Sequence, residues 1–241
     1  MYRFRQKASS SDRLNAFTLI ELLVVVGVIG VLAATILPAL SKAKQRSIQT
    51  HCMSNLKQIG IAMQLYVNDS DDSLPGPVWS GARASYDRDT SKEELIYFIA
   101  DYLDAPNPLT VSPNKPVVAE VFVCPGYIRA APDFTSIMGR KCYLLKDNVS
   151  DDPDPAKRVR PFGYPELGDP PTSPAIPPLK MSLLETFCSL SDTYAITDVD
   201  KINVPNPTVS WQGDLPAKPV HGEVRNELYF DWHVAMKHVD W

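Results

Sequence analysis

The chain has 241 residues, of which 44% are hydrophobic and 22% are charged. This balance is typical of a folded protein with an apolar core and excludes a chain that is disordered throughout. The 24 basic and 28 acidic residues give a net charge of −4, which argues against a nucleic-acid-binding protein, because such proteins gather lysine and arginine on one surface.

The charge is unevenly distributed along the chain. Residues 1–16 carry Arg3, Arg5, Lys7 and Arg13 against Asp12 alone, so the acidic excess lies in the rest of the chain. A basic start, followed by an apolar run and an acidic body, is the order expected for a chain oriented across a membrane.

The apolar run covers residues 17–40 and reads FTLIELLVVVGVIGVLAATILPAL. As a helix rising about 1.5 Å per residue, it is long enough to cross a hydrocarbon core of about 30 Å. The core helix of a soluble protein is the first alternative, but such a helix carries a polar stripe, which residues 22–34 lack. A secretory signal peptide cut after Ala34 is the second alternative, and the length of the run and its one acid argue against it.

That acid is Glu21, the single charged residue within the run. An ionised carboxylate inside a bilayer is costly unless it finds a partner, so it is a functional candidate by default. The run contains no basic residue to pair with it. The partner must come from another chain, from lipid headgroups or from a new amino terminus.

Residues 15–24, NAFTLIELLV, resemble the class III signal of type IV pilins and type II secretion pseudopilins. The resemblance implies that a prepilin peptidase removes a leader at 1–16 by cutting between Ala16 and Phe17, and that the new amine is methylated. Glu21 would then be the fifth residue and Pro38 the twenty-second, as in the family, although Ala16 stands where the family usually has glycine.

The same resemblance implies how such a chain works. Glu21 would meet the amine of a neighbouring subunit's Phe17 during assembly, and the protein would be a structural filament subunit without catalytic activity. Its partners would be the prepilin peptidase, other pilin-like subunits in a homo- or hetero-filament, and lipid of the bacterial inner membrane. It would cross that membrane once, with its carboxyl-terminal domain in the periplasm or outside the cell.

A second helical stretch follows the apolar run directly. No proline occurs between Pro38 and Pro75, and apolar residues recur at helical spacing on one face: Ile48, Cys52, Leu56, Ile59, Met63 and Tyr66. We therefore expect one helix over about 18–68, with a transmembrane half at 17–40 and a periplasmic half within 41–75. Pro38 predicts a bend near the membrane exit.

Two further segments narrow the resemblance. Residues 52–60, CMSNLKQIG, and the spacing of His221, nine residues and Asp231 resemble a large pseudopilin-like family that ends in a His-x9-Asp-Gly pattern. This chain has Trp232 where that family has glycine. Because a tight hairpin turn often needs a positive φ that glycine adopts freely, Trp232 predicts a turn that is shifted or of another type.

Residues 76–241 are expected to form a globular α+β domain, with a small antiparallel sheet packed on the long helix. Ser91 and Glu94 have the spacing of a capping box for a short helix. Residues 151–180 hold nine prolines and predict a long loop, either a spacer or a subunit contact. Runs rich in β-branched and aromatic residues predict strands at 117–123, 141–145, 193–199, 225–230 and 233–237.

The four cysteines are Cys52, Cys124, Cys142 and Cys188. All lie on the side expected outside the cytoplasm, where disulfides can form. Sequence leaves three pairings open, of which we favour Cys52–Cys124, and no cysteine pair has the local spacing of zinc ligands.

Other side chains with metal-binding or acid–base chemistry are few. Asp231 and His233 face the same way in an extended segment, and His221 could lie on the neighbouring strand, but a hydrogen-bonded turn is the preferred interpretation. Acidic residues at 69, 71 and 72 and at 198 and 200 are weak candidates for calcium. No other cofactor is predicted.

Three functions from different classes therefore stay open. The first is a structural subunit of a type II secretion or type IV pilus-like filament, which the sequence favours. The second is a membrane-anchored surface or periplasmic binding protein that uses the pilin-like helix only as an anchor. The third is a membrane-anchored enzyme that uses His221, Asp231 and His233.

Overall fold

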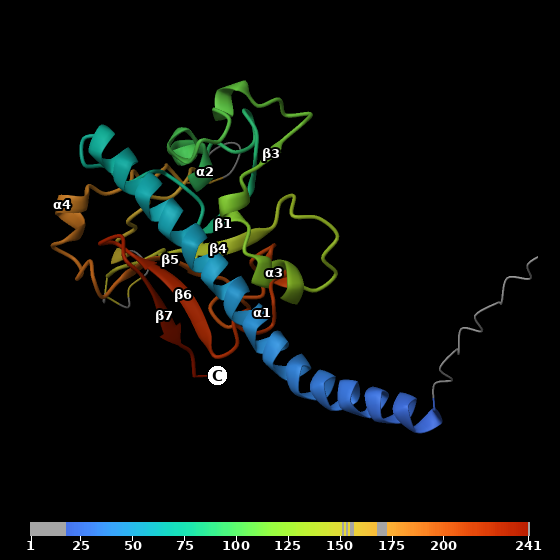
Figure 1. The fold of residues 1–241 in the computed structure, drawn as a ribbon. Helices are drawn as coiled ribbons and strands as arrows, with labels where there is room; N and C mark the ends of the chain where they lie inside the picture. The colour runs from blue at the N-terminus through green and yellow to red at the C-terminus, as the bar shows by residue number, and fades with distance from the viewer. Residues whose placement is uncertain (1–17, 151, 153, 155–156, 168–172, 241) are drawn as a thin grey trace, which may run out of the picture. The chain divides into compact units, whose positions relative to one another are not determined.

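The structure is a computed structural model that describes residues 18–150, 152, 154, 157–167 and 173–240 (Figure 1). The predicted leader at 1–16, with Ala16, and the adjoining Phe17 lie outside the described residues. The chain divides into two compact units, Met1–Lys44 and Gln45–Trp241. An α+β architecture is confirmed, since a long amino-terminal apolar helix is followed by an antiparallel sheet.

The long helix α1 spans Leu19–Asp69, within one residue of the predicted range, and continues through Pro38. Its part within the second unit is amphipathic as predicted. Cys52, Leu56, Ile59 and Met63 are fully buried, while Ile48 and Tyr66 at the two ends of this face are half-buried.

The main sheet has five antiparallel strands in the order β1-β4-β5-β6-β7. Four of them were predicted to within one residue at each end. The strands are β1 Gly81–Arg83, β4 Lys141–Leu145, β5 Tyr194–Asp198, β6 Val224–Tyr229 and β7 Val234–His238. Strands β2 Ser85–Tyr86 and β3 Val117–Val118 form a separate pair.

The carboxyl-terminal part of α1 packs against this sheet (Figure 1). Gly60 allows the close approach, because a Cβ atom there would lie 2.7 Å from Cδ1 of Leu228 on β6. The remaining short helices are α2 Leu95–Ile99, α3 Pro125–Ala130 and α4 Met181–Leu184, with 3-10 turns at Ala100–Leu103, Pro108–Thr110, Glu120–Phe122 and Gln212–Asp214.

The predicted strand at 117–123 is wrong beyond Val118. After two paired residues, the Ala119 N–H still donates to the Ala84 carbonyl at 2.9 Å, and the chain then turns through Glu120–Phe122. The turn buries Phe122 completely and delivers Cys124 to the start of α3. Burial of one aromatic ring therefore outweighs the strand propensity of the β-branched run.

The predicted capping box at Ser91 and Glu94 is also wrong. The helix α2 begins after Glu94, whose side chain makes no capping bond. The Ser91 hydroxyl accepts from the Asp87 N–H at 3.0 Å, and the Glu94 carboxylate faces Arg83 and Lys141 at 3.2 and 3.6 Å. The Glu94 carboxylate therefore pairs with Arg83 and Lys141 instead of capping the helix.

The turn between β6 and β7 corrects the expectation for Trp232. This residue adopts a φ of +69°, so tryptophan takes the left-handed conformation rather than avoiding it. The Trp232 N–H donates to the Tyr229 carbonyl at 3.0 Å, and the Lys57 ammonium on α1 donates to the Trp232 carbonyl at 2.8 Å. The Trp232 ring packs against the core. These contacts offset the steric cost of this conformation, about 1–2 kcal/mol.

The proline-rich segment is a loop in its described residues, as predicted, held by isolated bridges between Tyr164 and Ile176 and between Leu167 and Ser173. It is attached to the domain through Phe162, which is buried and stacks on Phe230 with ring centroids 5.8 Å apart. The described part of the loop is therefore packed on the domain at this point.

Candidate functional site

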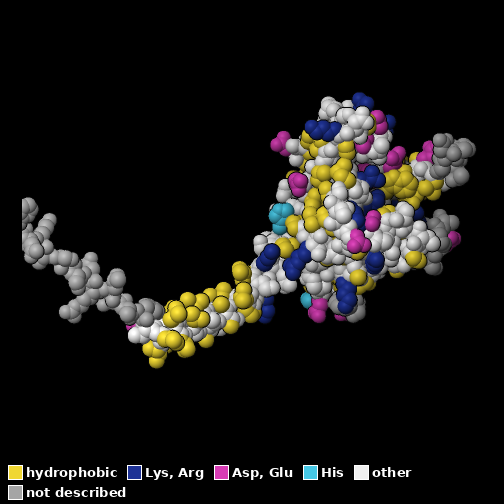
Figure 2. All heavy atoms as spheres, turned by 90° about the vertical axis from the view of Figure 1, so that its right-hand side faces the viewer, with side chains coloured by type: hydrophobic (Ala, Val, Ile, Leu, Met, Phe, Trp, Pro, Cys, Tyr) yellow, Lys and Arg dark blue, Asp and Glu magenta, His cyan; other side chains and the backbone are white. Residues whose placement is uncertain are grey.

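The amino-terminal unit presents an uncovered apolar surface. Within residues 19–40 the large apolar side chains are between 48% and 81% exposed, and they form a continuous hydrophobic covering along this part of α1 (Figure 2). By length and composition, α1 is the one described helix able to cross a membrane, with a mean hydropathy of 2.7 over its most apolar 18 residues. Such a helix fits a membrane anchor.

Glu21 lies in the first turn of this helix and forms a capping box with Thr18. The Thr18 N–H and hydroxyl donate to Oε2 of Glu21 at 2.8 and 2.7 Å, and the Glu21 N–H donates to the Thr18 hydroxyl oxygen at 3.3 Å. The Thr-x-x-Glu spacing was present in the sequence and carries this information. Among the described residues, Thr18 thus supplies the local partner of the acid.

The two glycines of the apolar helix, Gly27 and Gly30, face open space. A Cβ atom at either position would meet nothing within 4 Å among the described residues. The helix surface around them therefore has room for the close approach of another apolar element. Pro38 lies further along the same helix.

In the second unit, three residues far apart in sequence come together: Cys52 on α1, Cys124 at the start of α3, and His221 before β6. Their ligand atoms all lie within 4.8 Å of one another, with Sγ of Cys124 3.5 Å from Nε2 of His221. Hydrogen bonding to the Cys124 thiol and to the imidazole lowers the pKa of Cys52, whereas burial raises the pKa of Cys124.

All four cysteines are free thiols in the structure, so the favoured Cys52–Cys124 pairing stays a prediction, although these two thiols are neighbours. Cys142 on β4 is buried, and burial raises its pKa to about 12. Cys188 is half-buried, and its thiol faces the Leu184 carbonyl at 3.8 Å.

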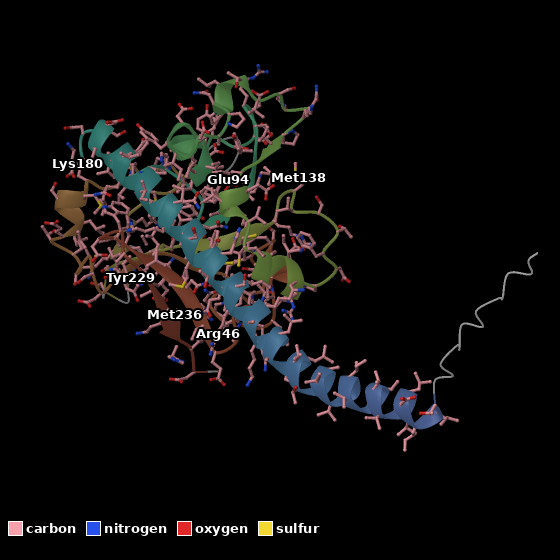
Figure 3. All side chains as sticks on the ribbon, viewed as in Figure 1. Arg46, Glu94, Met138, Lys180, Tyr229 and Met236 are labelled. Carbon is pink, nitrogen blue, oxygen red and sulfur yellow. The ribbon has the colours of Figure 1, made fainter. Side chains whose placement is uncertain are left out.

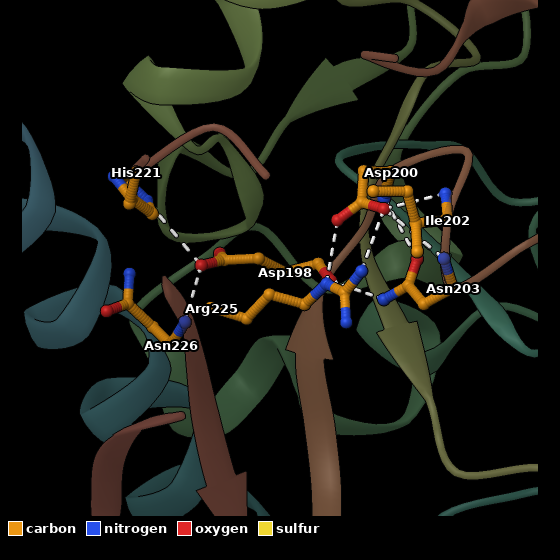
Figure 4. Close-up of polar contacts among 7 residues, drawn as sticks. All are labelled: Asp198, Asp200, Ile202, Asn203, His221, Arg225 and Asn226. Atoms are coloured by element: carbon orange, nitrogen blue, oxygen red, sulfur yellow. Dashed lines mark hydrogen bonds and ion pairs between the residues drawn. The ribbon is translucent and has the colours of Figure 1, made fainter. Parts of the chain in front are cut away.

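The acidic pair at 198 and 200 divides between two environments (Figure 4). Asp200 receives a bidentate ion pair from Arg225, at 2.7 and 2.9 Å. Asp198 is buried, lies 3.5 Å from Nε2 of His221 and accepts from the Asn226 N–H at 2.7 Å. Burial raises the pKa of Asp198 to about 7.

The acids at the carboxyl end of α1 are engaged by protein groups. Asp69 accepts from the Tyr102 hydroxyl at 3.0 Å, and Asp72 accepts from the Ser182 N–H at 3.0 Å. Asp71 pairs at 2.6 Å with Lys180, which Figure 3 labels. The bonds of Asp71 and Asp72 connect the helix end to α4 and the residue before it, and the bond of Asp69 connects it to the 3-10 turn Ala100–Leu103, so the role of these acids is structural.

The predicted grouping of His221 with Asp231 and His233 is not assembled. Asp231 and His233 are joined in the β6–β7 turn, with Oδ1 2.5 Å from Nδ1, and the His233 ring stacks on Tyr229 at 4.3 Å. His221 instead faces Cys124 and Asp198. The preferred interpretation of Asp231 and His233 as a hydrogen-bonded turn agrees with this geometry.

A cavity of about 910 Å³ opens beside β1 and β4. Its lining includes five basic residues and one acidic residue, Asp147, together with four aromatic rings. These residues are Arg83, Lys141, Lys146, Arg158 and Arg160, and Trp79, Tyr164, Tyr194 and Trp211. Sequence gave no signal for this cavity, because its walls come from separate segments of the chain.

Comparison with known proteins gives one partial likeness. A segment of 61 residues is 41% identical to the type IV major pilin protein PilA of Myxococcus xanthus (strain DK1622), covering 25% of this chain. The match spans 28% of the length of that pilin. No family model and no solved structure matches the chain. Over this segment the chain is similar to a type IV pilin, and it carries the long apolar amino-terminal helix described above.

Proposed function

We propose that the chain is a structural, pilin-like subunit of a type II secretion or type IV pilus-like filament. The observation that carries this proposal is the uncovered apolar half of α1 with one acid, Glu21, in its first turn. An apolar surface of this extent requires lipid or other apolar helices around it. The partial likeness to a type IV major pilin supports helices of similar subunits as that environment.

In this proposal the helix has two successive environments. Before assembly it anchors the chain in the bacterial inner membrane, with residues 45–241 on the periplasmic side. During assembly it packs among the helices of other pilin-like subunits. Gly27 and Gly30 offer close approach to a neighbouring helix, as small residues do in membrane helix pairs.

Processing by a prepilin peptidase would create the group that Glu21 needs. A cut between Ala16 and Phe17 places an ammonium at Phe17, and the amine of an incoming subunit could reach the Glu21 of its neighbour. Opposite charges attract strongly where water is excluded, and pairing removes the cost of burying each alone. Thr18 occupies Oε2 of Glu21, which leaves Oε1 as the acceptor for this amine.

The mature amino terminus tests the processing step. Intact-mass and amino-terminal sequencing of protein purified from membranes should show a chain that begins at Phe17, with an N-methyl group. A chain that still begins at Met1, or one cut after Ala34, contradicts the proposal. Replacement of Ala16 by glycine should preserve the cut, while a bulky residue there should block it.

A catalytic role is not proposed. The three residues that sequence offered for an enzyme, His221, Asp231 and His233, contribute to two separate arrangements rather than to one site. The chain is instead the substrate of the processing peptidase.

The cavity beside β1 and β4 favours a second candidate function, a surface binding protein that uses the helix as an anchor. Arg83 and Lys141 pair with Glu94, and Arg158 and Arg160 pair with Asp147. An acidic ligand would compete with these carboxylates for the basic groups, and the aromatic rings would pack against the ligand's own rings. Titration of detergent-purified protein with an oligogalacturonate tests this candidate. Binding that Arg160→Ala removes, in a chain that forms no filament, would favour the anchor function over the structural one.

A further inference from the structure

The group of Cys52, Cys124 and His221 has the composition and burial of a metal centre. Both cysteines are fully buried, and the His221 side chain is 2% exposed. The three ligand atoms lie within 4.8 Å of one another, although the residues come from three distant segments of the chain. All three belong to the same compact unit.

The separation of the Cys124 sulfur from the His221 nitrogen agrees with tetrahedral zinc. Typical Zn–S and Zn–N bonds of about 2.3 and 2.0–2.1 Å, at a tetrahedral angle, place sulfur and nitrogen about 3.5 Å apart. Sγ of Cys124 and Nε2 of His221 are separated by 3.5 Å. The nitrogen that faces the sulfur is therefore already at the distance that a shared ion requires.

Asp198 is a buried acid that lies beside His221 of this group (Figure 4). Its side chain is 2% exposed, and Oδ2 lies 3.5 Å from the same imidazole nitrogen. Its other oxygen, Oδ1, is buried without a hydrogen-bond partner among the described residues, as are both amide atoms of the neighbouring Asn226 side chain. A buried carboxylate in this condition is costly, and a cation beside it reduces that cost.

The backbone is shaped to bring the imidazole to the thiols. A Cβ atom at Gly126, two residues after Cys124, would lie 2.9 Å from Cε1 of His221 and 3.1 Å from Cγ2 of Val220. Glycine at this position therefore permits the close approach of the His221 ring.

We propose that Cys52, Cys124 and His221 bind a zinc ion, with an Asp198 oxygen as the fourth donor after rotation of its side chain. Thiolate and imidazole donors suit zinc and not calcium or magnesium. Binding requires both cysteines as thiolates, so any thiol proton still present is released. With the Asp198 carboxylate included, the ion and its ligands carry a net charge of −1. The ion would fasten α1 to the segments that precede α3 and β6.

The competing chemistry is a Cys52–Cys124 disulfide, which would remove both thiolates from the ligand set. Zinc binding and the disulfide are mutually exclusive, and measurements on the full-length protein in detergent distinguish them. Protein purified without chelator, from cells grown with zinc, should contain about one zinc per chain by mass spectrometry of the metal. Its intact mass should show reduced cysteines.

Variants locate the ion. Cys52→Ser and His221→Gln should each lower the zinc content to less than about a tenth of that of the unchanged chain. Cys188→Ser is the matched control, because Cys188 lies outside the group, and it should retain the full content. Circular dichroism establishes that each variant is folded.

Cobalt supplies a readout that does not depend on the variants. Titration of the metal-free wild-type protein with Co²⁺ should give a thiolate-to-cobalt charge-transfer band that saturates at about one ion per chain. A metal-free protein with a Cys52–Cys124 disulfide, or one with free thiols and no such band at excess Co²⁺, would overturn the proposal. Filament assembly is not part of either readout, so failure here is distinct from failure of the proposed function.

Discussion

Thr18 and Glu21 bind each other at the start of α1, through two bonds to Oε2 of Glu21 and one bond back to the Thr18 hydroxyl. The acid that seemed isolated in an apolar run therefore has a local partner. Thr18 binds one of its oxygens, Oε2, and in the proposed filament the other oxygen would accept from the amine of a second molecule. Helix capping and intermolecular pairing are thus compatible roles of the same carboxylate.

The capping role predicts a local effect of Thr18→Ala. Loss of the hydroxyl should destabilise the first turn by about 1 kcal/mol, so the Glu21 amide should exchange with solvent faster by about fivefold. Amide hydrogen exchange of the full-length protein in detergent measures this. Thr18→Ser, which keeps the hydroxyl, is the control, and equal exchange in all three proteins would contradict the capping role.

The approach of α1 to the sheet predicts a cost for Gly60→Ala. The new methyl group would lie 2.7 Å from Cδ1 of Leu228, so either the side chain or the helix must move, at a cost of about 1–3 kcal/mol. The thermal midpoint should fall. Leu228→Val in the same chain should recover part of the loss, whereas Gly27→Ala, where a methyl meets open space, should leave the midpoint unchanged.

The left-handed conformation of Trp232 predicts an order of stability between two variants. Both Trp232→Gly and Trp232→Ala lose the packing of the ring, but only glycine removes the steric cost of a φ of +69°. The glycine variant should therefore be more stable than the alanine variant by about 1 kcal/mol. Denaturant midpoints measure the difference, and an alanine variant of equal or greater stability would show that the turn changes conformation.

Burial of Glu94 predicts a pH dependence. Burial raises the pKa of Glu94 above its ordinary 4.5, although Lys141 and Arg83 oppose the shift. Above pH 4.5 the folded chain thus keeps a proton that the unfolded chain has lost, so this group's contribution to the free energy of unfolding decreases as pH rises through the folded pKa. The thermal midpoint of unfolding of Glu94→Gln, measured at a series of pH values above 4.5, should therefore fall less steeply with pH than that of the unchanged chain.

The exposed neighbour Glu93 gives the control for this measurement. Glu93→Gln removes one carboxylate from the same segment at the surface and should leave the slope of stability against pH as it is in the unchanged chain. A slope that Glu94→Gln does not alter would show that the carboxylate is ionised in the fold over the whole range.

The parts of the fold that follow local rules were predictable. The buried face of α1 follows from helical spacing, and strands β4 to β7 follow from runs of β-branched and aromatic residues, because each of these signals lies within one segment. The segment at 117–123 failed because burial of Phe122 decides its path. The motif at Ser91 and Glu94 failed because Arg83 and Lys141 bind the carboxylate.

The candidate sites divide in the same way. Glu21 and Pro38 lie on α1 and Thr18 directly precedes it, so sequence spacing alone could place them. The neighbours of His221 could not be found by spacing, because Cys52 and Cys124 are brought to it by the packing of α1 and by the turn before α3. Because the three residues come from distant segments, they lack the local spacing by which zinc ligands are recognised in a sequence.

Filament formation by Glu21→Ala, measured beside Thr18→Ala, tests the account most directly. Thr18→Ala loses the two capping bonds of the hydroxyl and keeps the carboxylate, whereas Glu21→Ala loses the carboxylate that would meet a neighbour's Phe17 amine. Sheared and sedimented filaments, quantified by immunoblot against the membrane fraction, should be present for Thr18→Ala and absent for Glu21→Ala. Normal filaments from Glu21→Ala would contradict the account.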